Sequence, residues 1–557
     1  MAKPARGLSD SFRPSESPWG TSLSGPNCHD GYQKSNWRSQ RLSGEKTRHD
    51  QFAIWLQPLP GEVCNKLNNA LVSTEDSSPL TSFPTRSGGP STLETFDRFR
   101  EKVLAGVKNP QLRNYGLILL MAGAGLLPLM AGSAHAEPLK MQEADGADTL
   151  LMLMGSALVL LMTPGLAFFY GGFTRAKNVL NTMMMSFFLM GLVGVVWVVI
   201  GYSLSFGADF KSPFIGGLEF LMMNNVGVTP PFPGYTISAS SFALFQGMFA
   251  IITPALISGA VVERINFKAW FWFCLLWSIF VYCPLAHMVW GGGYIYTDIG
   301  ALDFAGGTVV HISSGVAALI SAAIVGPRTN WPENGRPPHN VPFILLGAGL
   351  LWFGWFGFNG ASYFAAKGAG LSFATTSTSA SAALLAWCLI EWLKDGKPTA
   401  VGAATGAVAG LVGITPGAGF VTIGSSLIIG AASALACFIA VRIKAAIKFD
   451  DSLDTFMVHG VGGTVGALLT GVFAVKEFVD PNFFPKSAEV LASGGNVGMF
   501  IAQLKAVVLA YGFVAIATAI ILWIVGAIFG LRVSSSDEER GLDFVAHGEE
   551  AYDPMTY

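Results

Sequence analysis

Two stretches of the sequence decide the fold. Residues 303–311 read Asp-Phe-Ala-Gly-Gly-Thr-Val-Val-His, and residues 451–459 read Asp-Ser-Leu-Asp-Thr-Phe-Met-Val-His. In both, an aspartate precedes a histidine by eight positions, and a glycine (Gly315 or Gly463) follows the histidine by four. Each stretch leads into an apolar run, so the pattern predicts that two related segments each place a histidine in a hydrophobic environment.

The apolar runs around these stretches predict a bundle of membrane helices. The chain has 557 residues, of which 51% are hydrophobic and 13% charged, and its mean hydropathy is +0.49. Soluble domains carry roughly 25% charged residues. Eleven apolar stretches follow residue 137: 149–172, 179–203, 240–262, 269–288, 308–325, 341–358, 371–393, 399–413, 418–441, 455–475 and 499–530. The eighth is short and rich in glycine, so it is expected to cross only if it packs inside the bundle.

A second pair of motifs has the same separation of five spans. Span one ends in Gly-Leu-Ala-Phe-Phe-Tyr-Gly-Gly (165–172), and span six ends in Gly-Trp-Phe-Gly-Phe-Asn-Gly (354–360). An odd separation reverses the direction in which a segment crosses the membrane. We therefore predict an all-α polytopic fold of eleven transmembrane helices with an inverted five-plus-five repeat, and a site where the two halves meet.

Lysine and arginine in the short loops predict the orientation. With the mature N-terminus outside, the inner loops contain eleven of these residues and the outer loops contain four. Basic residues are enriched in cytoplasmic loops. The C-terminal tail, residues 533–557, is therefore expected in the cytoplasm, and the expected location is the inner (plasma) membrane.

The segment before the spans has a different composition. Residues 1–114 are polar and are expected to be a disordered extension or a wrongly assigned start. Residues 115–136 form an apolar run that ends in Ala-His-Ala, which predicts a signal peptide and a mature membrane domain of residues 137–532. The alternative is a cytosolic extension followed by a first spanning helix.

Several classes of function are excluded by composition. No basic stripe interrupts the apolar body, so a nucleic-acid partner is not expected. The six cysteines form no C-x-x-C pair, and no Cys, Asp or Glu stands at ligand spacing beside the two histidines of the repeat. We find no nucleophile–base constellation and no P-loop, so neither an enzyme nor a cofactor is expected.

His311 and His459 are the histidines that lie well inside apolar spans. Ionisable residues at membrane depth are energetically costly and usually face a cavity or each other. Because the repeat gives both residues equivalent places, we expect a facing pair in which one ring nitrogen donates and the other accepts a proton. The alternatives are two separate histidines bonded to neighbouring helices, or a metal site.

Other candidate residues have two readings each. Asp303 and Asp451 are candidates for helix caps and for groups that attract a cation, and the two roles are compatible. Trp290 ends span four, where it is an aromatic-belt residue or a cation–π face. His287, at the same helix end, is expected to be structural.

Three phenylalanines complete the set of candidates. Phe245 and Phe249 lie four positions apart on one helical face, and Phe358 ends span six. Aromatic stripes of this kind are usually core, and the alternative is a gate.

These motifs resemble the ammonium transporter (Amt) family, in its bacterial type. The resemblance rests on residues 303–328, 245–250 (Phe-Gln-Gly-Met-Phe-Ala), 286–293 (Ala-His-Met-Val-Trp-Gly-Gly-Gly), 354–362 (Gly-Trp-Phe-Gly-Phe-Asn-Gly-Ala-Ser) and 458–463 (Val-His-Gly-Val-Gly-Gly). It runs from about residue 148 to 552, and several long motifs follow in the family's order.

The resemblance implies a role for each matching residue. Phe245, Trp290 and Ser362 would recruit ammonium at the outer mouth, and Phe249 and Phe358 would form a gate beneath it. His311 and His459 would line the pore as a twin-His pair, with Asp303 supporting deprotonation. Trp290 together with Ser362 indicates the Amt branch of the Amt/Rhesus superfamily.

The resemblance also extends to assembly and to the tail. It implies a homotrimer in which every protomer has its own pore. Five tail residues match the family's cytoplasmic regulatory tail: Gly541, Asp543, His547, Gly548 and Tyr552. In the family this tail couples pore state to regulation, often through a PII signalling protein. Two other functions stay open: an ammonium sensor with little flux, and a Rhesus-type channel for neutral NH₃.

Overall fold

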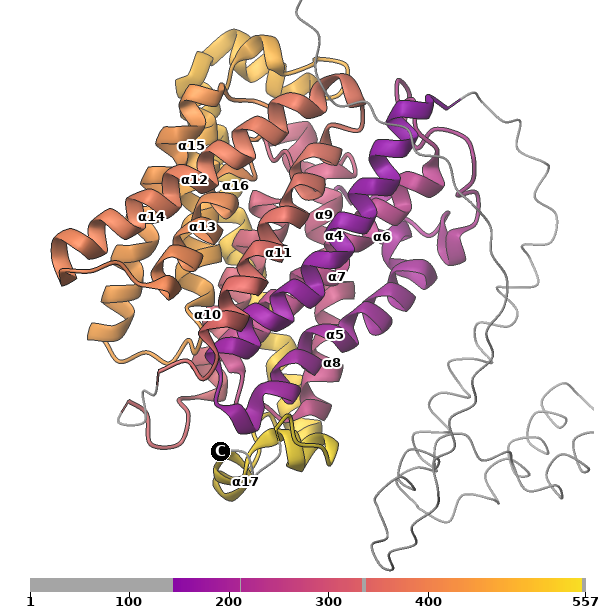
Figure 1. Cartoon of the computed structure of the whole chain (residues 1–557). Coiled ribbons are helices and arrows are strands. Elements are labelled where there is room, and N and C mark those ends of the chain that lie inside the picture. Colours follow the sequence, from indigo (N-terminus) through magenta and orange to yellow (C-terminus); the bar gives the residue numbers. More distant parts are fainter. Residues whose placement is uncertain (1–143, 211, 333–336, 553–557) are drawn as a thin grey trace, which may run out of the picture. The chain divides into compact units, whose positions relative to one another are not determined.

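The structure is a computed structural model that describes residues 144–210, 212–332 and 337–552. The predicted N-terminal extension, the signal peptide and the mature start near residue 137 lie outside the described residues. In the described part, long helices cross one another as a bundle, and the regular structure is helical (Figure 1). Two isolated β-bridges join Asp209 to Gly216 and Ile265 to Arg532. The predicted all-α membrane fold is confirmed.

The helices of the bundle follow one another in chain order, and the connection between α6 and α7 is long. Their bounds are α4 Gly146–Phe173, α5 Val179–Val196, α6 Tyr202–Phe206, α7 Ala239–Val261, α8 Phe267–Trp277, α9 Cys283–Trp290, α10 Ser313–Val325, α11 Val341–Gly360, α12 Ala366–Asp395, α13 Ala400–Ile414, α14 Ile423–Ala446, α15 Val461–Phe473 and α16 Pro485–Phe529. After the bundle come α17, Ser535–Arg540, and the π-helical η11, Asp543–His547.

The number of spans depends on α13. Within the described residues, ten helical segments are long and apolar enough to cross a membrane, and the apolar α13 is shorter than these. Most of α13 is buried, and it packs against α11, α12 and α14. This is the packing that the eighth predicted span requires.

Two features differ from the predicted spans. α16 joins two helical segments across a kink at Gly495: the second agrees with the predicted span of 499–530, and the first, from Pro485, is polar, so an apolar window misses it. Gly495 interrupts this helix with a φ of +58°. Several helices also contain π-helical turns, among them η7 (Gly307–Ile312) and η9 (Phe456–Gly460), which hydrophobic periodicity does not predict.

The first helices of the two predicted halves, α4 and α11, pack side by side (Figure 1). Their backbones approach closely where one of them carries glycine. A Cβ added at Gly347 of α11 would lie 2.3 Å from the backbone nitrogen of Phe169. Small residues at such crossings are typical of helix packing in membranes, where van der Waals contact drives association.

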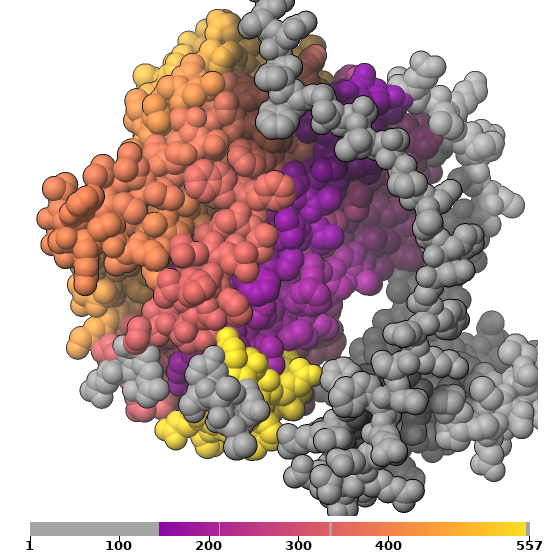
Figure 2. Space-filling model, viewed as in Figure 1, coloured from indigo at the N-terminus to yellow at the C-terminus, as the bar shows by residue number. Residues whose placement is uncertain are grey.

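One end of the bundle, which we call the tail end, is held by a buried ion network and the C-terminal tail. The Glu263 carboxylate bonds Arg175 at 3.0 Å and Arg328 at 3.0 Å, and Arg328 bonds Asp450 at 2.8 Å. Burial by itself would raise the pKa of Glu263, but Arg328 and Arg175 outweigh it and lower the pKa to about 2. The C-terminal segment, yellow in Figures 1 and 2, covers this same end.

Candidate functional site

The two histidines of the repeat meet inside the bundle. The Nδ1 atoms of His311 and His459 lie 3.2 Å apart, and the rings stack with centroids 5.3 Å apart. Both side chains are buried. At this distance one Nδ1 donates a proton and the other accepts it, so the pair shares one hydrogen bond.

The π-helical turns η7 and η9 present these rings to each other. A Cβ added at Gly315, one turn beyond His311, would lie 2.2 Å from the backbone nitrogen of Gly460. The segments therefore touch backbone to backbone next to the histidines. This close approach brings side chains 148 positions apart in the chain into hydrogen-bond contact.

The surroundings of the pair are apolar and narrow. The cavity beside the rings has a volume of about 10 Å³ and is lined by Leu, Ile, Val, Met, Trp and Phe side chains. Trp355 stacks on His311 at 5.4 Å. Nε2 of His311 has no hydrogen-bond partner among the described residues. The cavity has room for about one water-sized molecule, and the imidazoles supply its polar groups.

Asp303 forms the turn that leads into His311. Its carboxylate accepts hydrogen bonds from the backbone N–H groups of residues 306–309, at 2.6–3.1 Å. Its carbonyl oxygen accepts the indole N–H of Trp290 at 2.8 Å. Asp303 thus acts as a helix cap and also fixes the plane of the Trp290 ring.

A buried amide on α16 holds the residue before Asp303. The Gln503 side chain accepts a hydrogen bond from the N–H of Leu302 at 2.9 Å and donates to the carbonyl of Leu302 at 2.8 Å. It also donates to the carbonyl of Ala467 at 2.9 Å. Gln503 therefore ties the helix outside the repeat to the Asp303 turn. The sequence analysis missed it, although a polar residue in an apolar span was the available signal.

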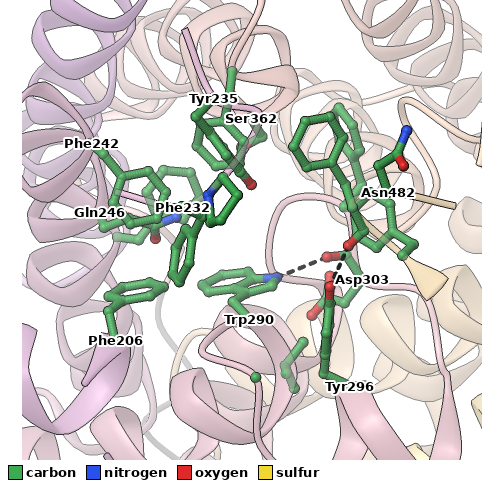
Figure 3. Close-up of a pocket in the computed structure, with 18 residues that line it drawn as sticks. Phe206, Phe232, Tyr235, Phe242, Gln246, Trp290, Tyr296, Asp303, Ser362 and Asn482 are labelled. Carbon is green, nitrogen blue, oxygen red and sulfur yellow. Dashed lines mark hydrogen bonds between the residues drawn. The ribbon is translucent and has the colours of Figure 1, made fainter. Parts of the chain in front are cut away.

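At the end of the bundle opposite the tail lies a cavity of about 280 Å³, which we call the Trp290 cavity (Figure 3). Trp290, Asp303, Ser362, Phe249 and Gln246 are among its lining residues. Four of these, Trp290, Ser362, Asp303 and Phe249, are residues that the sequence singled out. Gln246 was missed, because it stands unmarked between the two phenylalanines of the family motif.

Two stacked phenylalanines separate this cavity from the histidines. Phe249 lines the Trp290 cavity and Phe358 lines the histidine cavity. Their rings stack at 4.2 Å with an interplanar angle of 27°. Phe245 does not line the Trp290 cavity. It is buried and packs edge-to-face on Phe249 at 4.9 Å, so it supports the stack from behind.

Asp451 occupies the equivalent position at the tail end. Its carboxylate accepts the N–H of Phe456 at 2.7 Å, at the start of η9. Burial raises its pKa to about 6. Because Asp303 and Asp451 lie at opposite ends while their histidines meet, the two segments are arranged as an inverted repeat requires.

His287 lies outside the cavity. Its Nδ1 is 3.2 Å from the carbonyl oxygen of Ser205, and its Nε2 is 3.0 Å from the Asp209 carboxylate. It is fully buried behind the Gly291–Gly293 turn. The structure therefore places it as a link between α9 and the loop after α6.

The tail residues contact the start of α5 and the loop before α11. The Asp543 carboxylate accepts the N–H groups of Leu180 and Asn181 at 3.1 and 2.8 Å, at the start of α5. His547 bonds Asn181 at 3.1 Å, and the Tyr552 hydroxyl bonds His339 at 2.9 Å. Gly541 and Gly548 adopt φ values of +111° and +70°, which turn the tail onto this surface.

No group of three or more His, Cys, Asp or Glu side chains in the described ranges could hold a metal ion. The arrangement is instead an acidic and aromatic cavity, an aromatic stack, and a histidine pair in a narrow apolar cavity. Such an order of environments suits a small cation at the acidic and aromatic end and a small neutral molecule in the apolar part.

The chain matches the model of the Ammonium Transporter Family over residues 150–552. An ammonium transporter of Aquifex aeolicus is 46% identical over 431 residues, which cover 77% of this chain and 97% of the relative. One of Bacillus subtilis is 45% identical over 411 residues, which cover 73% and 98%.

Solved structures agree with these relatives. The crystal structure of Saccharomyces cerevisiae Mep2 is 36% identical, with a TM-score of 0.66, and covers 74% of this chain and 93% of its own. A structure titled Sensor Amt Protein is 29% identical, with a TM-score of 0.66, and covers 72% and 98%.

Proposed function

Because the chain belongs to the ammonium transporter family, we propose that it binds NH₄⁺ in the Trp290 cavity, removes its proton, and passes NH₃ along the apolar path of His311 and His459. The observation that carries this proposal is the order of the three environments. Phe249 lines the Trp290 cavity, Phe358 lines the histidine cavity, and the stacked rings of these two residues join the one cavity to the other.

Recruitment of the cation needs a face that attracts charge without a formal salt bridge. The indole N–H of Trp290 is committed to the Asp303 carbonyl, so its ring face is the part that meets a ligand. A cation over an indole face gains about 0.5–2 kcal/mol. Ser362 donates its proton to the Phe358 carbonyl at 2.7 Å, which leaves the lone pairs of its oxygen available.

Deprotonation follows from the narrow apolar cavity. A charged group without compensating partners is strongly disfavoured in apolar surroundings, whereas a neutral amine is tolerated far better. K⁺ has no proton to release, so the same cavity rejects it. The hydrogen bond between His311 and His459 gives the released proton a path beside NH₃, and Asp303 supports the release with its negative charge.

The orientation and assembly are part of the same proposal. The Trp290 cavity faces the outside, and the tail end faces the cytoplasm of the inner (plasma) membrane. The mature chain starts near residue 137 after removal of a signal peptide. Three protomers form a homotrimer, and the tail end offers the surface for a PII signalling protein.

A second function is a sensor of ammonium with little flux. It is favoured by the likeness to the structure titled Sensor Amt Protein. The two functions differ in one measurement, since a transporter produces a sustained ammonium-evoked current. A Rhesus-type neutral channel is the third function, and it would transport NH₃ without current.

Replacing Trp290 with leucine is expected to weaken ammonium binding. Loss of a cation–π contact of about 0.5–2 kcal/mol raises the half-saturating ammonium concentration by roughly a few-fold to thirtyfold. The measurement is ammonium-evoked current with purified protein on a supported membrane. A Trp290→Phe variant keeps an aromatic face and should lie between wild type and the leucine variant.

If Trp290→Leu folds normally and keeps the wild-type half-saturating concentration, Trp290 is an interfacial belt residue. If the wild-type protein itself gives no ammonium-evoked current, the transport proposal is wrong, and NH₃ flux and ligand binding then separate the channel from the sensor.

Replacing Asp543 with alanine is expected to release the tail from α5. The carboxylate caps two backbone N–H groups, and loss of such a cap destabilises a protein by about 0.5–2 kcal/mol. We expect a lower maximal current and a small fall in melting temperature. The exposed Glu549→Ala serves as the tail control. Unchanged current in Asp543→Ala would remove the support for a regulatory tail.

A further inference from the structure

One polar side chain in the Trp290 cavity has no role so far. Phe242, Gln246 and Phe249 line the cavity from one face of α7 (Ala239–Val261), spaced by four and three positions. Gln246 is the polar member of this face and is only 5% exposed. In the view of Figure 3 it lies across the cavity from Asp303, with the Trp290 ring between them.

The amide of Gln246 is unsatisfied within the protein. Its Oε1 is buried without a hydrogen-bond partner among the described residues. Buried amides nearly always have partners, because an unpaired one loses its hydration without compensation. A buried, unpaired amide that lines a cavity of about 280 Å³ therefore points to a ligand in that cavity.

The polar groups of Asp303, Trp290 and Tyr296 in the cavity are already engaged. Both carboxylate oxygens of Asp303 accept backbone N–H groups, and the Trp290 N–H donates to the Asp303 carbonyl. The Tyr296 hydroxyl donates to the Phe483 carbonyl at 2.6 Å. The Asp303 carboxylate thus contributes charge, while the oxygens that remain free to accept a proton donor belong to groups such as Gln246 and Ser362.

We propose that Gln246 is a direct ligand of the cation in the Trp290 cavity, with its amide oxygen accepting one N–H of ammonium. This inference rests on the proposed transport of ammonium. Ammonium carries four N–H groups and needs acceptors, whereas the aromatic rings of the cavity offer none of conventional strength. Rotation of the terminal amide by about 180° exchanges its oxygen and nitrogen, so the oxygen can face the ligand in either of the two positions.

The contact with Gln246 would make cation binding directional in a site that is otherwise aromatic. A cation–π face attracts any small cation, but an amide oxygen at a fixed position favours a cation that points a proton at it. Gln246 would therefore hold ammonium over the Phe249–Phe358 stack. The consequence is that it contributes to affinity before the proton is lost, and not to the later passage of NH₃.

The test compares ammonium-evoked current for the wild type, Gln246→Leu, Gln246→Glu and Thr253→Val. Leucine has a similar size without an acceptor, and glutamate keeps an acceptor in the same place. Thr253 is a matched control, since it is a buried polar residue of α7 that bonds the Phe249 carbonyl of its own helix. The half-saturating ammonium concentration and the inhibition by K⁺ are measured for each.

We expect Gln246→Leu to raise the half-saturating ammonium concentration by about tenfold or more, because the variant loses a hydrogen bond to a charged group. Gln246→Glu should restore ammonium binding and increase inhibition by K⁺, because its charge attracts both ions. Thr253→Val should match the wild type.

The inference is overturned if Gln246→Leu keeps the wild-type half-saturating concentration, or if Gln246→Glu binds ammonium as weakly as Gln246→Leu. Either result would mean that the amide shapes the cavity or holds a water molecule. Absence of current from the wild type itself would instead contradict the proposed transport.

Discussion

Replacing His311 with alanine is expected to reduce ammonium-evoked current by at least about a hundredfold, which corresponds to roughly 3 kcal/mol in the barrier. The variant removes one of two imidazoles that share a hydrogen bond of 3.2 Å. Between the Phe249–Phe358 stack and His459 there is then no side chain that can accept the released proton. NH₃ should still permeate, because the widened passage stays apolar.

An acidic replacement at position 311 tests whether a fixed negative charge allows an intact cation to pass. A carboxylate at position 311 would face Trp355 and Phe358, whose rings lie 5.4 and 5.9 Å from the present imidazole. It could pair with an intact cation and so lower the penalty for charge in the narrow cavity. We expect His311→Glu to conduct ammonium with its charge and to admit K⁺.

The measurement is current with ammonium and separately with K⁺, in liposomes of matched protein content. Ser314→Ala is the control for local packing, since that hydroxyl bonds the Val310 carbonyl of its own helical turn at 2.6 Å. Wild-type current and full exclusion of K⁺ in His311→Ala would show that proton relay through this pair is not the mechanism.

Replacing Gly315 with alanine is expected to prevent the two halves from docking. The added Cβ would lie 2.2 Å from the nitrogen and 2.4 Å from the Cα of Gly460, both of which are backbone atoms. Overpacking typically destabilises a core by about 1–3 kcal/mol, and more where the neighbour is backbone that cannot rotate away. The same contact sets the distance between His311 and His459, so transport should be lost together with stability.

Melting temperature in detergent, yield of monodisperse protein and ammonium-evoked current are the three readouts for this variant. Gly349→Ala is the matched control, because a Cβ at Gly349 on α11 meets no atom within 4 Å. A wild-type melting temperature and current for Gly315→Ala would mean that the helices separate there without consequence, and that the close approach does not define the site.

The composition and order of the sequence determined the fold class. Apolar runs of spanning length can satisfy their backbone in a membrane as helices, so the spans follow from hydropathy. The repeated spacing of Asp303 to His311 and of Asp451 to His459 identified the halves. An apolar window misses the polar segment of α16 before Gly495, and hydrophobic periodicity does not predict the π-helical turns.

Some residues of the candidate site could also be identified from the sequence, and others only from the structure. His311, Trp290 and Asp303 could be singled out because an ionisable or amphipathic side chain in or beside a span needs a reason. Gln503 offered only the weak signal of a polar residue in an apolar span, and the role of Gln246 depends on hydrogen-bond partners that only the packed structure defines. The distinction between Phe249, which faces the Trp290 cavity, and Phe245, which lies behind it, also depends on the packed neighbours.

The sequence by itself thus determined which segments enter the membrane and which histidines lie at depth. The tertiary structure alone decided which groups meet: His311 with His459, Gln503 with Leu302, and Glu263 with Arg175 and Arg328. The physical reason is that hydrophobic burial is a property of each segment. A hydrogen bond or ion pair instead requires two groups within about 3 Å, and that distance is set by how the helices pack.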